Sequence, residues 1–196
     1  MLLNESGFDV QKKRESWINE ISKIEPERMV FLDESGVNTD LTRRYAWGIG
    51  KDRIADAVPC STPSSTTVLS SIRLSGQSIT TTYQGGTSGQ RFVVYLKEQL
   101  LPTLSQGDVV IMDNMRSHHV KAVAEAFEGT GIRVCYLPPY SPDLNPIEKM
   151  WSKMKSILRK LKIRSLELLP QAIRDALSQV SQSDCLGWFK SCGCTT

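Results

Sequence analysis

The sequence predicts an α/β fold in which helices flank a mixed β-sheet. Three strand-like stretches come first in the chain, and the strands that follow alternate with amphipathic helices. That order is typical of a sheet with helices packed on its faces. The 196 residues suffice for one domain with a full hydrophobic core, and we find no internal repeat or linker that would divide them.

The first half of the chain is predicted to contain one helix and three strands. Ser75-Gly76 predicts a hairpin turn between the second and third strands, and Glu34-Ser35-Gly36 predicts a turn after the first. Residues 42–54 mix basic and aromatic groups around two glycines and predict an exposed hairpin or loop, which either contacts nucleic acid or caps the sheet edge. The helix covers residues 8–25, and the strands cover 28–33, 67–74 and 77–83.

The second half alternates helices with strands. Val109 to Met112 form a short apolar run, which predicts a buried strand. A proline-rich turn then leads into a long amphipathic helix that starts at Asn145-Pro146. The other predicted helices cover residues 90–101, 120–128 and 166–180, a strand covers 132–137, and residues 181–196 are expected to be irregular.

Basic residues concentrate on the helix that starts at Asn145-Pro146. The net charge of the chain is only +3, but seven basic residues and no acid lie between Lys149 and Arg164. A block of this kind is usually a solvated helix face, and it can also be a surface for a polyanion. Charge alone does not decide between the two.

Cysteine spacing and the N-terminus argue against several classes of protein. The five cysteines include no CxxC pair, and those near the C-terminus lack a nearby histidine, so we expect reduced thiols and no zinc site. No apolar stretch has the length of a signal-peptide core or a membrane span. We therefore expect a soluble, cytoplasmic protein without a membrane partner.

Three acidic residues lie at predicted element boundaries. Asp113 ends the buried strand, Glu148 lies in the first turn of the basic helix, and Asp33 ends the first strand. Clustered carboxylates must share protons or bind cations, and oxygen ligands select hard cations such as Mg²⁺ or Mn²⁺. Two such ions about 4 Å apart can activate an attacking oxygen and stabilise the leaving oxygen of a phosphodiester. The acids therefore predict a two-metal site for in-line displacement at phosphorus.

Each acid also has a purely structural interpretation. Glu148 falls three residues after Asn145, so these two residues could form a capping box. Asp113 and Asn114 could be a turn-forming pair, and Asp33 could belong to an ordinary turn. The three acids together, each at an element boundary, favour the metal site over three unrelated structural roles.

The histidines and the tryptophan near these acids have weaker signals. His118 and His119 could be one exposed and one locally hydrogen-bonded imidazole, or His118 could lie near a bound phosphate or a metal-bound water. Trp151 lies on the apolar stripe of the basic helix, so we expect it in the core and not as a platform for a base.

Three sequence stretches resemble a known family. FLDESG, VVIMDNMRSHH and LPPYSPDLNPIEKMWSKMK are similar to the catalytic domain of the mariner-like insertion-sequence transposases, the DDE group with a ribonuclease H-like fold. Between Asp113 and Glu148 lie 34 residues, the spacing typical of that superfamily. The resemblance runs from about Trp17 through the basic helix, and more loosely to the end of the chain.

The resemblance implies an enzyme that nicks double-stranded DNA at the ends of a transposable element and joins the freed 3′ hydroxyl to target DNA. It implies Mg²⁺ or Mn²⁺ as the cofactor and a basic helix face that meets DNA phosphates. The residues on the family's positions are the catalytic and metal-binding triad Asp33, Asp113 and Glu148, the site-supporting Asn114, His118 and Asn145, and the DNA-binding Lys149, Lys153, Lys155 and Arg159.

The resemblance also implies an organisation and partners. The catalytic domain would span residues 28–182, after a lead-in helix in residues 1–27 and before an irregular tail at 183–196. Members of this group usually carry N-terminal helix-turn-helix modules, for which residues 1–27 are too few. We therefore expect either a separate helix-turn-helix chain or a truncated copy. A homodimer is expected because two DNA ends must be joined, in a bacterial-type, nucleoid-associated setting.

Two other functions fit the same residues less well. A structure-specific nuclease such as a Holliday-junction resolvase would share the fold, but the NPIExxW stretch argues against it. An inactive or domesticated fragment would bind DNA without turnover, and the intact triad argues against that function.

Overall fold

The protein is described by a computed structural model with full side chains. The described residues are 7–43, 45, 50, 55, 57, 64–115, 118 and 120–195. The exposed loop expected at residues 42–54 therefore lies almost wholly outside the described residues.

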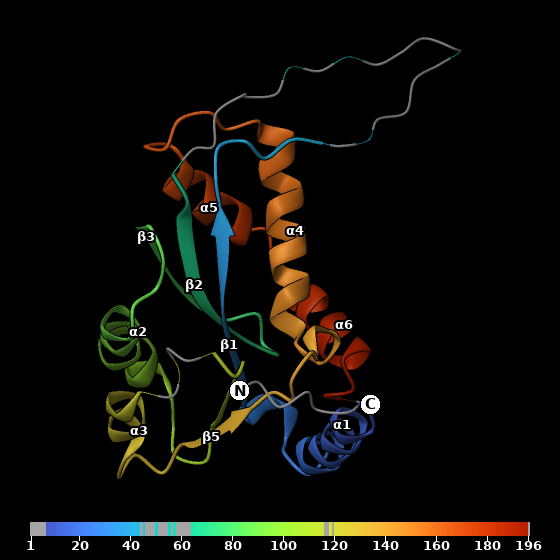
Figure 1. The fold of residues 1–196 in the computed structure, drawn as a ribbon, viewed down its shortest axis with the longest axis vertical. Helices are drawn as coiled ribbons and strands as arrows, with labels where there is room; N and C mark the ends of the chain where they lie inside the picture. Colours follow the sequence, from blue (N-terminus) through green and yellow to red (C-terminus); the bar gives the residue numbers. More distant parts are fainter. Residues whose placement is uncertain are drawn as a thin grey trace.

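A five-stranded mixed sheet forms the centre of the molecule (Figure 1), with the strand order β3-β2-β1-β4-β5. The central strand β1 (Met29–Val37) pairs antiparallel with β2 (Thr66–Arg73) and parallel with β4 (Val109–Met112). The edge strands are β3 (Ser78–Gln84), antiparallel to β2, and β5 (Arg133–Tyr136), parallel to β4. The predicted mixed sheet is confirmed, with strands close to their predicted positions.

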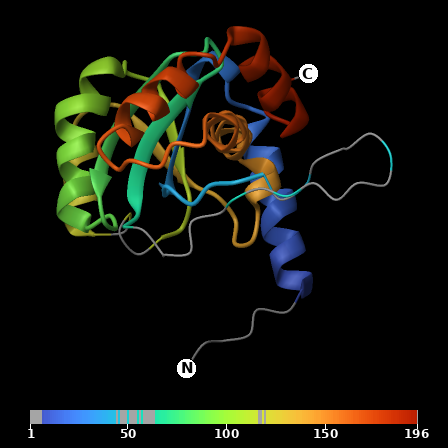
Figure 2. The same ribbon diagram turned by 90° about the horizontal axis from the view of Figure 1, so that it is seen from above.

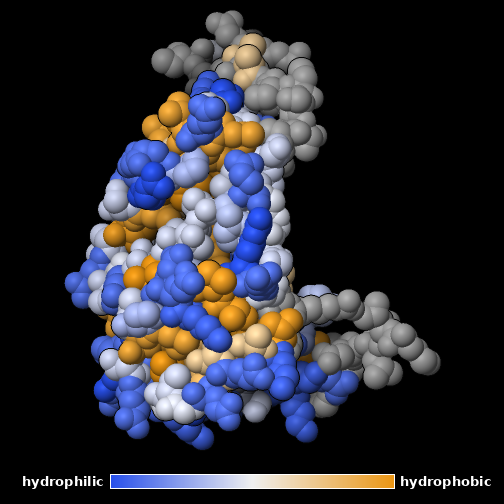
Figure 3. Space-filling view, turned by 90° about the vertical axis from the view of Figure 1, so that its left-hand side faces the viewer, coloured by the Kyte–Doolittle hydropathy of each residue, from blue (hydrophilic) through white to orange (hydrophobic). Residues whose placement is uncertain are grey.

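Helices cover both faces of the sheet, as the view along α4 makes clear (Figure 2). The short helices α2 and α3 pack on one face, and that side of the molecule intersperses hydrophilic with hydrophobic side chains (Figure 3). The other face carries α4 together with α1, α5 and α6. The helices are α1 (Gly7–Ile21), α2 (Gly89–Tyr95, continued by a π-helical turn Leu96–Leu100), α3 (Lys121–Phe127), α4 (Pro146–Leu161), α5 (Leu169–Leu177) and α6 (Gln182–Ser191), with 3-10 turns at Pro26–Arg28, Leu101–Thr103 and Pro142–Leu144.

Side chains along β1 alternate between the two hydrophobic clusters. Met29 and Phe31 pack into the cluster under α4, whereas Val30 and Leu32 pack into the cluster under α2. A strand points successive side chains to opposite faces. Asp33 therefore belongs to the α4 face of the sheet, and the residue after it belongs to the α2 face.

The turn predicted at Glu34-Ser35-Gly36 is wrong, because β1 continues through these residues to Val37. Each of them pairs with a residue of β2, from Glu34 opposite Leu69 to Val37 opposite Thr66. The long antiparallel ladder with β2 satisfies the backbone groups of this stretch, so the local turn propensity of Ser-Gly does not decide its conformation.

The irregular tail expected at residues 181–196 is also wrong, because α6 occupies most of it. Ser181 and Asp184 form a capping box, in which the Ser181 hydroxyl accepts from the Asp184 amide at 3.1 Å and the Asp184 carboxylate accepts from the Ser181 amide at 2.8 Å. Cys185 and Phe189 bury one face of α6 in the core under α4. None of the described helices is both long and apolar enough to cross a bilayer.

Candidate active site

The three predicted catalytic acids come from three elements that meet at one edge of the sheet. Leu32 of β1 and Met112 of β4 are partners in the parallel ladder, so Asp33 and Asp113 are the next residues on two adjacent strands. α4 begins beside this edge and carries Glu148 in its first turn. The negative charges of Glu148 and Asp113 both reach Asp33, since both raise its pKa. The three acids therefore come from elements that adjoin one edge of the sheet.

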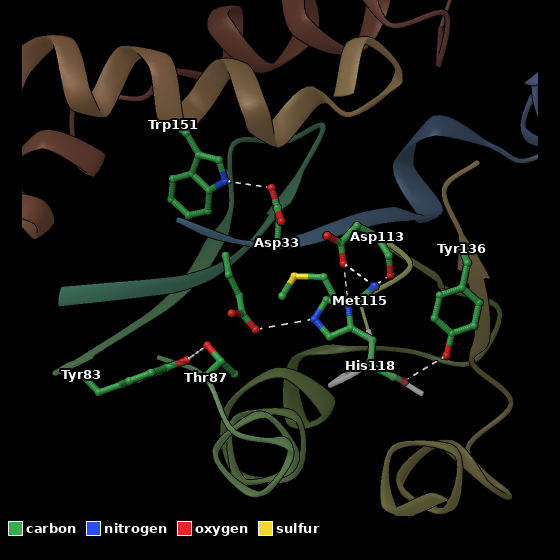
Figure 4. Close-up of polar contacts among 9 residues, drawn as sticks. Asp33, Tyr83, Thr87, Asp113, Met115, His118, Tyr136 and Trp151 are labelled. Atoms are coloured by element: carbon green, nitrogen blue, oxygen red, sulfur yellow. Dashed lines mark hydrogen bonds and ion pairs between the residues drawn. The ribbon is translucent and has the colours of Figure 1, made fainter. Parts of the chain in front are cut away.

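Asp33 is buried, with only 6% of its surface exposed. Its carboxylate accepts a hydrogen bond of 3.1 Å from the indole Nε1 of Trp151, one turn into α4 (Figure 4). Burial raises the pKa of Asp33 to about 7, although hydrogen bonds from the Glu34 amide and Trp151 work in the opposite direction, and the charges of Glu148 and Asp113 add to the rise. Without a cation, this carboxyl group is thus poised to hold a proton.

Asp113 is held by His118. The Nδ1 of the imidazole lies 2.8 Å from the Asp113 carboxylate and 3.1 Å from its backbone carbonyl oxygen. The same carboxylate oxygen accepts from the amide of Met115 at 3.2 Å. Figure 4 shows the His118 ring pointing toward Asp113. His118 is therefore a locally hydrogen-bonded imidazole, and its partner is Asp113, one of the three predicted acids.

The His118 ring is completely buried on the α2 face of the site. It stacks on Phe92 of α2 with ring centroids 4.3 Å apart, and the Tyr136 hydroxyl donates to its carbonyl oxygen at 3.2 Å. Burial lowers the pKa of His118, but the hydrogen bonds to Asp113 and the nearby Glu34 carboxylate outweigh burial and raise the pKa to about 9. An imidazolium at this position would neutralise part of the negative charge of the carboxylates.

The capping-box interpretation of Glu148 is wrong, because the Asn145 side chain makes no capping hydrogen bond to α4. Asn145 is buried, and its Oδ1 has no hydrogen-bond partner among the described residues. Glu148 is exposed. Asn114 is exposed next to Asp113. A buried amide oxygen without a partner at the start of α4 is consistent with a site that takes a further ligand.

The basic residues of α4 divide into two stripes. Positions i, i+4, i+7 and i+11 share one helix face. Counting from Glu148, that face carries Lys155 and Arg159. Counting from Lys149 gives a second face, which carries Lys153 and Lys160. These three lysines line a groove of about 620 Å³ between α4 and α6. The ammonium group of Lys153 already has partners in this groove. Its Nζ contacts the Asp184 carboxylate at 2.6 Å and donates to the Gln179 carbonyl at 2.8 Å.

The donor set fits a hard divalent cation by its chemistry. Asp33, Asp113 and Glu148 offer only carboxylate oxygens, and their mutual repulsion is the electrostatic problem that a cation solves. Within the described part of the chain, however, no three His, Cys, Asp or Glu side chains are spaced to hold an ion. A cation would have to draw the three carboxylates together from their present separation.

Sequence reasoning missed one side chain that contacts Asp33 and another that contacts the imidazole beside Asp113. Trp151 was assigned to the core alone, and with 2% exposure it does lie in the core. Its indole N–H also donates a hydrogen bond to Asp33. Glu34 was assigned to a turn, whereas its Oε1 lies 3.6 Å from Nε2 of His118. The NPIExxW stretch, which contains Trp151, carried a usable signal, and nothing local to Glu34 did.

A mixed sheet in this strand order, with acids at β1, β4 and the start of α4, defines a ribonuclease H-like fold. Residues 28–169 match the family described as DDE superfamily endonuclease, which covers more than half of the chain. The chain belongs to this family. No curated protein sequence matches it significantly.

Solved structures of a mariner transposase, Mos1, share the fold. The Mos1 strand transfer complex superposes with a TM-score of 0.76 at 18% identity, over 94% of this chain and 57% of that chain. The paired-end complex with Mn superposes with a TM-score of 0.74 at 18% identity, over 98% of this chain and 61% of that chain. The isolated Mos1 catalytic domain superposes with a TM-score of 0.66 at 15% identity, over 98% of this chain and 91% of that chain. This chain thus spans about three fifths of the full Mos1 chains and nearly all of their catalytic domain.

The hydrogen bond from Trp151 to Asp33 predicts an unequal effect of two identical substitutions. Trp151→Phe keeps an aromatic ring but removes the donor, so we expect it to lower the free energy of unfolding by about 2 kcal/mol. Trp17→Phe is the matched control, because the Trp17 Nε1 is buried and has no hydrogen-bond partner among the described residues. Urea denaturation measures both values. Equal losses for the two variants would contradict the structural importance of this hydrogen bond.

The raised pKa of Asp33 predicts a pH-dependent stability without metal. The folded protein holds this proton up to about pH 7, and the unfolded chain releases it near 3.8, so the contribution of Asp33 is complete below about pH 4 and is lost as the pH rises to about 7. Asp33→Asn removes the titrating carboxyl group, so the variant does not lose this stability as the pH rises. In chelator, the variant should gain on the order of 3 kcal/mol relative to the wild type between those pH values. A difference that stays constant with pH would contradict the assignment.

Proposed function

We propose that this chain is the catalytic domain of a DDE transposase, which cuts DNA at the ends of a transposable element and joins the 3′ hydroxyl to target DNA. The observation that carries the proposal is the meeting of Asp33, Asp113 and Glu148 at one sheet edge in a member of the DDE endonuclease family. The similar Mos1 structures support it, since they include a pre-cleavage transpososome, a strand transfer complex and a paired-end complex with a transposon end.

Mg²⁺ or Mn²⁺ is the proposed cofactor, held by the carboxylates of Asp33, Asp113 and Glu148. Mos1 paired-end complexes have been solved with each of these ions. When bound, such ions supply activation of the attacking oxygen and neutralisation of the charge that develops on the leaving oxygen. Two residues of this chain orient the carboxylates. Trp151 fixes Asp33 through its N–H, and His118 fixes Asp113 through Nδ1.

Lys155 and Arg159 are the proposed contacts to the DNA backbone, because they share the helix face of Glu148. Lys149 and Lys153 lie on the stripe that faces α6, where Lys153 already pairs with Asp184, so they would contact DNA only along the flank of α4. End recognition, dimerisation of the active form and any separate helix-turn-helix chain belong to the same proposal, as does a nucleoid-associated role in a bacterial cell.

A nicking assay tests the proposed chemistry. Supercoiled plasmid with Mn²⁺ should be nicked by the wild-type chain, and Asp113→Asn should reduce the rate by more than about 100-fold, because it removes a ligand and not only a supporting residue. Asp175→Asn on the exposed face of α5 is the control and should nick as the wild type does. Absence of nicking by the wild type, also with transposon-end substrates, would identify the chain as an inactive remnant.

A binding assay tests the proposed DNA face of α4. The double variant Lys155→Gln/Arg159→Gln should weaken duplex binding and reduce the slope of log affinity against log salt by about 2, one for each lost phosphate contact. Lys149→Gln/Lys160→Gln changes the same number of charges on the other stripe and should leave most of the slope intact. Fluorescence anisotropy at several salt concentrations gives both slopes. A larger loss in the second variant would assign DNA to the groove beside α6.

A further inference from the structure

Glu34 is a largely buried acid with no role in the proposed triad. Its side chain is 11% exposed and lies on the α2 face of the sheet, opposite to the face that Asp33 occupies. A carboxylate rarely lies in such a position without a charged or hydrogen-bonding partner, because burial removes its water. The His118 imidazole lies beside it, with Nε2 at 3.6 Å from the Glu34 Oε1.

These two atoms have no other partner. Both the Glu34 Oε1 and the His118 Nε2 are buried without a hydrogen bond in the described part of the chain. The separation of 3.6 Å is only slightly longer than a hydrogen bond, so a small rotation of the Glu34 side chain joins them. An unmade bond between two buried polar atoms is costly, and this pairing satisfies both.

The imidazole between the acids can move very little. Phe92 stacks on it, the Tyr136 hydroxyl holds its backbone carbonyl, and its Nδ1 is committed to Asp113 at 2.8 Å. With a proton on each ring nitrogen, His118 donates to Asp113 on one side and to Glu34 on the other. The ring is then a rigid link from Glu34 to a catalytic carboxylate.

We propose that Glu34 is a positioning residue, which acts through His118 to fix the orientation of the Asp113 carboxylate toward a divalent cation. The inference rests on the proposed function and deepens it. Asp113 Oδ1 stays with His118 and the Met115 amide, so Oδ2 is the oxygen left for the ion. Two consecutive residues of β1 then serve the site from opposite faces: Asp33 as a ligand, and Glu34 as the support of another ligand.

Metal affinity of the chain without DNA tests this role, with Mn²⁺ binding followed by electron paramagnetic resonance. Glu34→Leu removes the acceptor and should weaken Mn²⁺ binding about tenfold, as loss of a residue that orients a ligand does. Glu34→Gln keeps an acceptor oxygen and should retain most of the affinity, whereas a purely electrostatic role would make it resemble Glu34→Leu. Glu125→Leu, on the exposed face of α3, is the control for loss of an acid.

A double-mutant cycle shows whether Glu34 acts through the imidazole. In the His118→Gln background, Glu34→Leu should cause no further loss of Mn²⁺ affinity, because the link is already broken. A tenfold loss that persists in this background would overturn the proposal, as would wild-type affinity in Glu34→Leu. If the wild type binds no Mn²⁺, the proposed function fails first, and that outcome differs from binding that ignores Glu34.

A second measurement does not depend on the stability of Glu34→Leu. The chain has two histidines, so His119→Gln leaves His118 as the only imidazole. Long-range proton–nitrogen correlation spectra should then show a slowly exchanging Nε2 proton, as expected for a buried donor bonded to Glu34, and Glu34→Gln should shift it. Absence of this proton signal in the folded chain would contradict the link between Glu34 and His118.

Discussion

The hydrogen bond from Trp151 to Asp33 is the contact on which the geometry of the site depends. α4 packs on the sheet through apolar side chains such as Ile147, Met150 and Met154, and apolar contacts tolerate small shifts of one element against another. The indole N–H is directional and has its acceptor on the central strand. It fixes α4 at the position where Glu148, one turn earlier, stands beside the same edge.

The alternation of β1 explains why acids surround this edge without lying in one cluster. Asp33 faces α4 and its tryptophan, and Glu34 faces α2 and the imidazole. The carboxylate of Asp33 accepts a hydrogen bond from α4, whereas the carboxylate of Glu34 lies 3.6 Å from the imidazole of His118. The pKa of Asp33 is raised chiefly because its carboxyl group is buried, and the negative charges of Glu148 and Asp113 add to the rise.

Local signals were sufficient to predict the sheet and the elements that carry the three acids. Asp113 follows a four-residue apolar strand, and Glu148 follows a helix start at Asn145-Pro146, so both positions could be inferred from neighbouring residues. The role of Trp151 could not, because its partner is 118 residues away in the sequence. The continuation of β1 past Asp33 depends on pairing with β2, which outweighs the turn propensity of Ser35-Gly36.

The error at the C-terminus affects the interpretation of the basic helix. The capping pair Ser181 and Asp184 was readable from the sequence, and it starts α6 against the flank of α4. Asp184 then has two functions, since its carboxylate caps α6 and pairs with Lys153. A run of seven basic residues therefore does not form one surface. Helix phase and the docking of α6 place Lys149, Lys153 and Lys160 along a groove, and they leave Lys155 and Arg159 as the positive charges on the face of Glu148. A polyanion that approaches the acids would therefore be attracted mainly by Lys155 and Arg159, and less by the total charge of the helix.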